Sequence, residues 1–249
     1  MNRKAVIISN PGESGAENYC GGVIKDVANY RLFLLSPIGG LWQRSEISEM
    51  SRPSIAEVRL EMQGLFTYDY VLVVFVGHGW HSTDLDSTIV RLRKGQEIDS
   101  NELRIGMTKQ TLILDCCRQP YPGMPEDRAL LEMLAKTAPP LHDQDCRRYY
   151  DKRIQDCAEE LVVMYACSTG QSAADNDATG GIYTYNLLRA SKAWARASTA
   201  DTSSEVEILS VVAAHEKTLP LVERLRGGRQ TPHIEKPRTG PYYPFCIVA

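Results

Sequence analysis

Long hydrophobic segments are missing from this 249-residue chain. Its longest apolar runs have about the length of a strand, well short of the roughly 20 residues that a membrane helix needs. The apolar part of the N-terminal segment is too short for a signal peptide. A net charge of -3 gives no general attraction to nucleic acid. Seven cysteines without a regular framework indicate free thiols in a reducing compartment, so we expect a cytoplasmic protein with neither a membrane nor a nucleic acid as its partner.

The sequence also lacks common motifs for phosphate, metal and dithiol chemistry. The turn-rich stretch 10–22 contains glycines but not the G-x-x-x-x-G-K pattern of a nucleotide phosphate loop. No C-x-x-C pair is present, which argues against a zinc ribbon or a thioredoxin-type site. A cysteine phosphatase needs an arginine at a fixed spacing after its cysteine, and Pro122 and Gly123 hold those positions here. Acidic loops leave calcium as an alternative, but no EF-hand-type loop is visible, so we expect no metal and no other cofactor.

Two apolar runs stand out because each ends in side chains that can react. Residues 70–76 lead into a histidine between two glycines (Gly77-His78-Gly79), and residues 111–114 lead into a carboxylate and two thiols (Asp115-Cys116-Cys117). Runs that are apolar at nearly every position predict strands buried on both faces of a parallel sheet. Such sheets place their chemistry just past the carboxyl ends of the strands. If the two runs are neighbouring parallel strands, a thiol and an imidazole meet there, as a nucleophilic cysteine site requires.

Strand-like and helix-like segments alternate along the chain, which predicts an α/β fold with a mostly parallel central sheet flanked by helices on both faces. No linker separates two units, so residues 1–249 are predicted to form one domain. Ser51 is the expected cap of the second helix and Ser203-Ser204 that of the last. The expected strands are 4–9, 70–76, 111–114, 161–167, 230–234 and 245–248, with a hairpin in 84–99; the expected helices are 22–35, 53–66, 126–136, 181–196 and 203–219.

Four short motifs resemble those of the caspase and metacaspase clan of cysteine peptidases. His78-Gly79 and Asp115-Cys116-Cys117 match the His-Gly and Asp-x-Cys that follow successive strands in that family. Residues 22–26 (GVIKD) are similar to the Gly-Cys-x-Asn-Asp of its first helix, and residues 166–185 resemble the start of its small-subunit region. The resemblance is closest to metacaspases and their prokaryotic, orthocaspase-like relatives, and it implies the caspase-like fold. Residues 118–120 (RQP) depart from the His-Ser-Gly that usually follows the metacaspase cysteine.

The resemblance implies a Cys-His dyad. The family's nucleophile stands two residues after the aspartate, which identifies Cys117. Its neighbour Cys116 should point to the opposite face of the strand and remain an inert, buried residue. His78 would act as general base and acid. The N–H groups of Gly79 and Cys117 would stabilise the oxyanion.

The resemblance also implies a specificity pocket lined by acids. Asp26 and Asp115 match family positions that receive an Arg or Lys side chain of the substrate, and Asp175 is a third candidate. Caspases that cut after Asp line this pocket with arginines instead. A guanidinium gains bidentate, charge-assisted hydrogen bonds from carboxylates. Two alternatives stay open: Asp115 could pair with Arg118, and Asp175 could be a loop-turn residue.

These features predict a cysteine endopeptidase that cuts protein or peptide substrates after Arg or Lys. Analogy with bacterial relatives suggests regulated cell death or phage defence. The alternative is a caspase-like scaffold without activity, which the intact pair of His and Cys disfavours. Residues 1–136 and 161–249 correspond to large and small subunit regions, and an upstream protease or a regulatory partner is the expected activator. Between them, residues 137–160 contain two dibasic pairs and form either a processing segment or a charged surface helix over 143–160.

Overall fold

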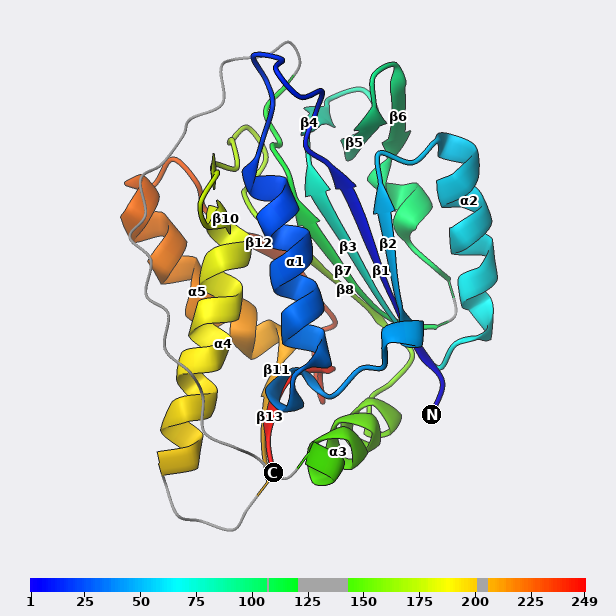
Figure 1. Ribbon diagram of the computed structural model, residues 1–249, viewed down its shortest axis with the longest axis vertical. Helices are drawn as coiled ribbons and strands as arrows, with labels where there is room; N and C mark the ends of the chain where they lie inside the picture. Colours follow the sequence, from blue (N-terminus) through cyan, green and yellow to red (C-terminus); the bar gives the residue numbers. More distant parts are fainter. Residues whose placement is uncertain (107, 121–142, 201–205) are drawn as a thin grey trace.

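A six-stranded sheet runs through the centre of the protein in the order β12-β8-β7-β3-β1-β2. The computed structural model describes residues 1–106, 108–120, 143–200 and 206–249. Only β12 is antiparallel to its neighbour, so the other strands all end at the same edge, at the top of Figure 1. The strands are β1 (Arg3–Asn10), β2 (Ile47–Ser51), β3 (Tyr70–Gly77), β7 (Lys109–Asp115), β8 (Leu161–Tyr165) and β12 (His233–Glu235).

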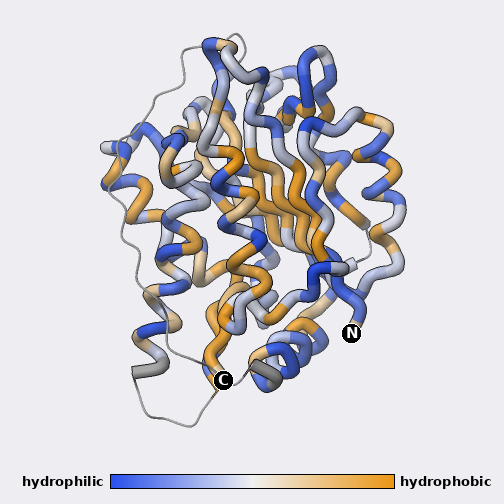
Figure 2. Tube along the Cα trace, in the orientation of Figure 1, coloured by the Kyte–Doolittle hydropathy of each residue, from blue (hydrophilic) through white to orange (hydrophobic). Residues whose placement is uncertain are grey.

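Both faces of this sheet are buried, because successive side chains of a strand point in opposite directions. In β1, Ala5 and Ile7 face a core shared with α1, α3, α4 and α5, whereas Val6 and Ile8 face a core shared with α2 and a small second sheet. Figure 2 shows the central strands as a block of hydrophobic chain. The prediction of a mostly parallel sheet flanked on both faces is confirmed. The helices are α1 (Gly22–Leu35), α2 (Ile55–Gly64), α3 (Asp143–Asp156), α4 (Ile182–Ala200) and α5 (Val211–Arg226).

Helix α2 begins later than predicted. Ser54, and not Ser51, is its cap: the hydroxyl of Ser54 accepts a hydrogen bond from Glu57 N (3.2 Å), and the Glu57 carboxylate accepts one from Ser54 N (2.7 Å). Ser51 instead ends β2, opposite Ser9 in the register. A reciprocal cap needs an acid or amide at the third helical position, and only Ser54 has one.

The prediction of a helix over residues 203–219 is wrong in its first part. Glu207–Ser210 form strand β11, which pairs antiparallel with β13 (Pro244–Val248) in a separate two-stranded sheet. Helix α5 is capped by Ser210 and continues through Pro220. The apolar β13 needs a strand partner, and this tertiary pairing outweighs the local helical periodicity. The expected cap at Ser203-Ser204 and the expected helix at 126–136 lie outside the described residues.

A three-stranded antiparallel sheet lies beside the carboxyl end of β3. It consists of β4 (Gly79–Ser82), β5 (Ser87–Arg93) and β6 (Gln96–Asp99), and its last two strands confirm the predicted hairpin. Arg91 N donates a hydrogen bond to the carbonyl oxygen of His78 (2.9 Å), and the Asn10 side-chain amide donates one to the carbonyl of Arg91 (2.8 Å). The hairpin thereby fixes the backbone of His78 against the main sheet.

Of the two alternatives for the charged segment, the structure shows the helix: α3 covers residues 143–156. Cys146, Tyr150 and Ile154, which repeat at helical spacing, are buried in the core. On the other side, the Arg147 guanidinium donates to both carboxylate oxygens of Glu46, at 2.6 and 3.0 Å. The dibasic pairs therefore lie in a docked helix. In the described part of the chain, no helix has both the length and the apolar character to cross a bilayer.

Candidate active site

The two reactive runs are neighbouring parallel strands, as predicted. β3 pairs with β7 along its length, and Val76 lies opposite Asp115 at the end of the register. His78 and Cys117 therefore follow two adjacent strand ends at one edge of the sheet. This edge is where an open parallel sheet places its ligands.

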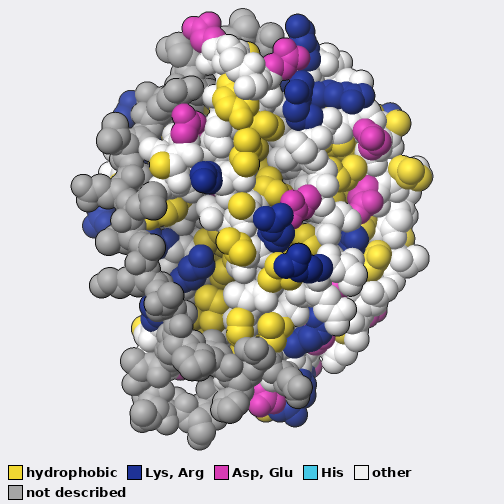
Figure 3. Space-filling view, viewed as in Figure 1, with side chains coloured by type: hydrophobic (Ala, Val, Ile, Leu, Met, Phe, Trp, Pro, Cys, Tyr) yellow, Lys and Arg dark blue, Asp and Glu magenta, His cyan; other side chains and the backbone are white. Residues whose placement is uncertain are grey.

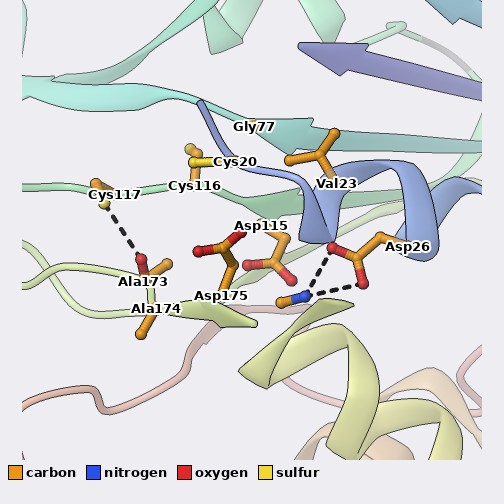
Figure 4. Close-up of a pocket in the computed structure, with 11 residues that line it drawn as sticks. Cys20, Val23, Asp26, Gly77, Asp115, Cys116, Cys117, Ala173, Ala174 and Asp175 are labelled. Atoms are coloured by element: carbon orange, nitrogen blue, oxygen red, sulfur yellow. Dashed lines mark hydrogen bonds between the residues drawn. The ribbon is translucent and has the colours of Figure 1, made fainter. Parts of the chain in front are cut away.

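The adjacent thiols lie in different surroundings. Cys116 is only 2% exposed and packs against Gly79, where an added Cβ would lie 2.6 Å from its sulfur. Burial, with a further contribution from Cys167, raises the pKa of Cys116 well above its usual value, so this thiol stays neutral. Cys117 is partly exposed, and its thiol donates toward the carbonyl oxygen of Ala173 at 3.4 Å (Figure 4). Both cysteines line the pocket described below, so Cys116 is not turned fully away from it, but of the two only Cys117 is more than marginally exposed.

The glycines beside His78 serve packing within the protein. Gly77 has φ = 145°, and a Cβ there would collide with the carbonyl oxygen of Asn10. Gly79 makes room for the sulfur of Cys116. Both glycines therefore let neighbouring segments pack closely on either side of His78, which is only 8% exposed.

The N–H group of Gly79 points toward the segment that follows β7. Two residues further along β4, His81 N donates a hydrogen bond to the carbonyl oxygen of Gln119 at 3.0 Å. N–H groups two residues apart on a strand point the same way, so Gly79 N–H faces the side on which Cys117 lies.

Three carboxylates converge on the pocket beside Cys117 (Figure 4). Asp26 lies on α1, Asp115 ends β7, and Asp175 opens the short strand β9 (Asp175–Asn176). Both oxygens of Asp26 accept from Gly181 N (2.8 and 3.0 Å), and Asp115 Oδ2 accepts from Thr184 N (3.1 Å) and Oγ1 (2.6 Å). Because these donors lie at the start of α4, the two acids also cap that helix from outside.

Burial and mutual repulsion change the acidity of these carboxyls. Burial raises the pKa of Asp26 well above its usual value, and the Asp115 carboxylate raises it further, although the bond from Gly181 lowers it. Burial raises the pKa of Asp115 to about 6 against the lowering effect of the Thr184 bonds, and Asp175 adds to the rise. Like charges in one site oppose joint ionisation. A bound cation would relieve this repulsion, so the pocket suits a positively charged group.

Arg118 does not neutralise Asp115. Its guanidinium lies 4.0 Å from the ring centroid of Tyr165 and donates to Thr88 Oγ1 (3.0 Å) and the carbonyl oxygen of Cys167 (3.3 Å). The alternative in which these two residues form an ion pair is therefore wrong. Among the residues with described positions, no group of three or more His, Cys, Asp or Glu side chains is arranged to hold a metal ion.

The pocket is narrow in this structure, with a volume of about 30 Å³, which is room for no more than a few water molecules. A long side chain enters only if a wall moves. Sequence reasoning missed several uncharged wall residues, because apolar and glycine positions carry no chemical signal of their own. These residues are Cys20, Val23, Ala173, Ala174 and Gly181.

Comparison with known proteins identifies the family and supports the fold. The family model described as caspase domain matches residues 2–243. The crystal structure of caspase-1 from Spodoptera frugiperda has a similar fold, with a TM-score of 0.56 over 94% of this chain and 87% of that chain, at 10% sequence identity. No curated protein matches this chain significantly. The chain belongs to the caspase-domain family of cysteine peptidases.

Proposed function

We propose that this protein is an active cysteine endopeptidase in which Cys117 and His78 form the catalytic dyad. One observation carries the proposal: an accessible thiol and a histidine follow adjacent strand ends, beside a pocket lined by carboxylates. In this reaction the sulfur of Cys117 attacks the carbonyl carbon of the scissile bond, and the thiol proton moves to the imidazole of His78. The oxyanion accepts hydrogen bonds from the N–H groups of Gly79 and Cys117.

The same imidazole completes the cycle. His78 gives its proton to the leaving amine as the C–N bond breaks, which leaves an acyl group on Cys117 as a thioester. The imidazole then takes a proton from a water molecule, whose oxygen attacks the thioester carbon. The C–S bond breaks, the new carboxyl terminus is released, and the sulfur of Cys117 regains its proton from His78. No carboxylate acts as a third catalytic group beside Cys117 and His78 in this mechanism.

We propose that Asp26, Asp115 and Asp175 receive the Arg or Lys side chain that precedes the scissile bond. Support comes from the convergence of three acids on one pocket and from the raised pKa of two of them, since a cation relieves their repulsion. Arg118, which lies close to Asp115 in the sequence, is engaged by other groups and does not neutralise that carboxylate. The resemblance to metacaspases and orthocaspase-like proteins points to the same selectivity.

Peptides with a fluorogenic group after Arg, Lys or Asp test this function. We expect kcat/KM after Arg and Lys to exceed that after Asp by on the order of 100-fold or more, because Asp would bring another carboxylate into an acidic pocket. A preference for the Asp peptide would contradict the proposal that the carboxylates of the pocket receive an Arg or Lys side chain. A folded chain that hydrolyses none of the peptides would favour the inactive scaffold.

Processing between the regions 1–136 and 161–249 also remains a proposal, and α3 sets a condition for it. The dibasic pairs Arg147-Arg148 and Lys152-Arg153 lie in a helix with a buried side, so the helix has to detach before a protease can bind it in extended form. We expect intact-mass analysis to show cuts in the wild type that appear faster in Glu46→Gln, which loses the closer of the two charged partners of Arg147. The inactive variant Cys117→Ala should stay whole.

Two outcomes of this measurement would change the account of processing. A wild-type chain that stays whole while it hydrolyses substrate would show that cleavage is not required. The same cut in the Cys117→Ala variant would assign it to another protease. We further propose a cytoplasmic protein substrate, an upstream protease or partner as the trigger, and a role in bacterial cell death or antiviral defence, all by analogy with prokaryotic relatives.

A further inference from the structure

A second and larger cavity lies beside His78. It holds about 620 Å³ and shares no lining residue with the acidic pocket: His78 lines the large cavity, whereas Cys117 lines the small one. Its walls come from the loop after β1, the residue after β2 and the β5–β6 hairpin. Figure 3 shows Lys and Arg side chains gathered at the top of the molecule, over this hairpin. The charged residues in the walls are Glu13, Arg52, Arg91, Lys94 and Glu97.

The cations of this cavity have more unused hydrogen-bonding capacity than its acids. Both oxygens of Glu97 are taken, one by Arg91 Nε (2.7 Å) and one by Trp80 Nε1 (3.3 Å). Arg52 meets Glu13 only at 3.5 Å, and its Nε is buried with no acceptor in the described structure. Three cations face two acids in the walls, and one of those acids is already fully engaged.

The backbone at Arg52 is unusual. Its φ of 51° lies in the left-handed region, which residues other than glycine seldom adopt. The conformation is held by a hydrogen bond from Arg52 N to the carbonyl oxygen of Ser9 (2.8 Å). Such conformations persist where the surrounding structure enforces them, and they cluster at ligand sites. Here Arg52, whose backbone has this conformation, lines the cavity beside His78.

We propose that this cavity binds the substrate residues that follow the scissile bond and favours acidic side chains among them. The inference rests on the proposed function and follows from the direction of the reaction. The residue before the bond fills the acidic pocket beside Cys117, and the leaving amine takes its proton from His78. The chain after the bond therefore departs past His78, into the cavity that this residue lines. Carboxylates there complement Arg52, Arg91 and Lys94, so the preferred substrate is a basic residue followed closely by acidic ones.

Three quenched fluorescent peptides test this inference. They share one sequence with a single Arg at the scissile position and carry Glu, Ala or Lys at both of the next two positions. We expect kcat/KM for the Glu peptide to exceed that for the Ala peptide by about fivefold, with the Lys peptide lower still by a similar factor. The preference should shrink at high salt, because the cavity is open to solvent.

Two variants assign the preference to the cavity. Lys94→Glu reverses a charge at the tip of the hairpin, and Arg52→Asn removes a charge with a residue that tolerates a positive φ. Each should reduce the Glu-to-Ala ratio of kcat/KM toward one, and Lys94→Glu should favour the Lys peptide. Arg238→Glu changes the net charge of the chain as Lys94→Glu does, but Arg238 is exposed and lines neither cavity. The Glu-to-Ala ratio of kcat/KM for this control variant should therefore equal that of the wild type.

The preference of the cavity and the peptidase activity can fail separately. If the wild type cuts all three peptides after Arg with equal kcat/KM, the proposed function stands and the inference is overturned. A preference that Arg238→Glu alters as much as Lys94→Glu does would also overturn it, because long-range charge would then explain the effect. If none of the peptides is cut after Arg, the proposed function fails and the inference fails with it.

Discussion

Replacing Cys117 with alanine is expected to lower kcat/KM for an arginyl fluorogenic peptide by on the order of 10⁴-fold or more, because the acyl-enzyme route is lost. His78→Ala should cause a comparable loss, and the two losses should not add, since the side chains act as one unit. Cys116→Ala should keep most of the activity, because its sulfur is buried against Gly79 and its neutral thiol does not face solvent.

Thermal unfolding separates these variants by a second property. Cys116→Ala deletes a buried sulfur and is expected to cost about 1–2 kcal/mol of unfolding free energy. Cys117→Ala, at a partly exposed position, should melt close to the wild type. If Cys116→Ala were inactive while well folded and Cys117→Ala active, the nucleophile would be the other thiol.

Asp115→Asn is expected to lower kcat/KM for Arg and Lys peptides by on the order of 100-fold, the cost of removing one charge from a close, desolvated pair. The asparagine oxygen can still accept the two hydrogen bonds from Thr184, so the start of α4 keeps its partner. The loss should appear as selectivity: the variant should retain a larger share of its rate toward an uncharged side chain at the scissile position. Equal losses for charged and uncharged peptides would show that Asp115 supports the fold and does not bind substrate.

Asp115→Asn loses activity, but at neutral pH it should lose less folding stability to ionisation than the wild type does. The pKa of Asp115 rises from 3.8 to about 6 on folding, so the folded state binds the proton more tightly than the unfolded chain does. The contribution of Asp115 to the free energy of unfolding of the wild type should therefore be most favourable below about pH 4. It should be lost as the pH rises through 6. Asp115→Asn removes this decline. Melting temperatures at pH 4 and pH 7 measure it, and an equal decline in both proteins would contradict the assignment.

The sequence predicts the central sheet and the position of His78 and Cys117 after two adjacent strand ends, because both depend on local pattern. Apolar runs such as residues 70–76 fit only strands buried on both faces, and parallel neighbours necessarily end at one edge. The motif order around His78 and Cys117 then indicates the family. These elements need no knowledge of distant contacts.

Features set by tertiary contacts could not be predicted in the same way. Residues 207–210 have a helical pattern and become a strand because β13 lies beside them. The docking of α3 includes a contact from Arg147 to Glu46, which lies roughly a hundred positions away in the sequence. The cavity beside His78 joins Arg52, from the end of β2, to the hairpin that carries Lys94. Such sites arise from the packing of separate segments, for which the local sequence carries no periodic signal.

Labelling with an arginyl chloromethyl ketone tests the central claim most directly. The reagent needs a nucleophilic thiol beside a pocket that accepts a cation, so its adduct reports both features at once. We expect one covalent adduct by intact mass, located on Cys117 by peptide mapping, and none with the aspartyl analogue or in His78→Ala. An adduct on Cys116 or Cys20, equal labelling by the aspartyl reagent, or a folded protein that takes up no label would contradict the account.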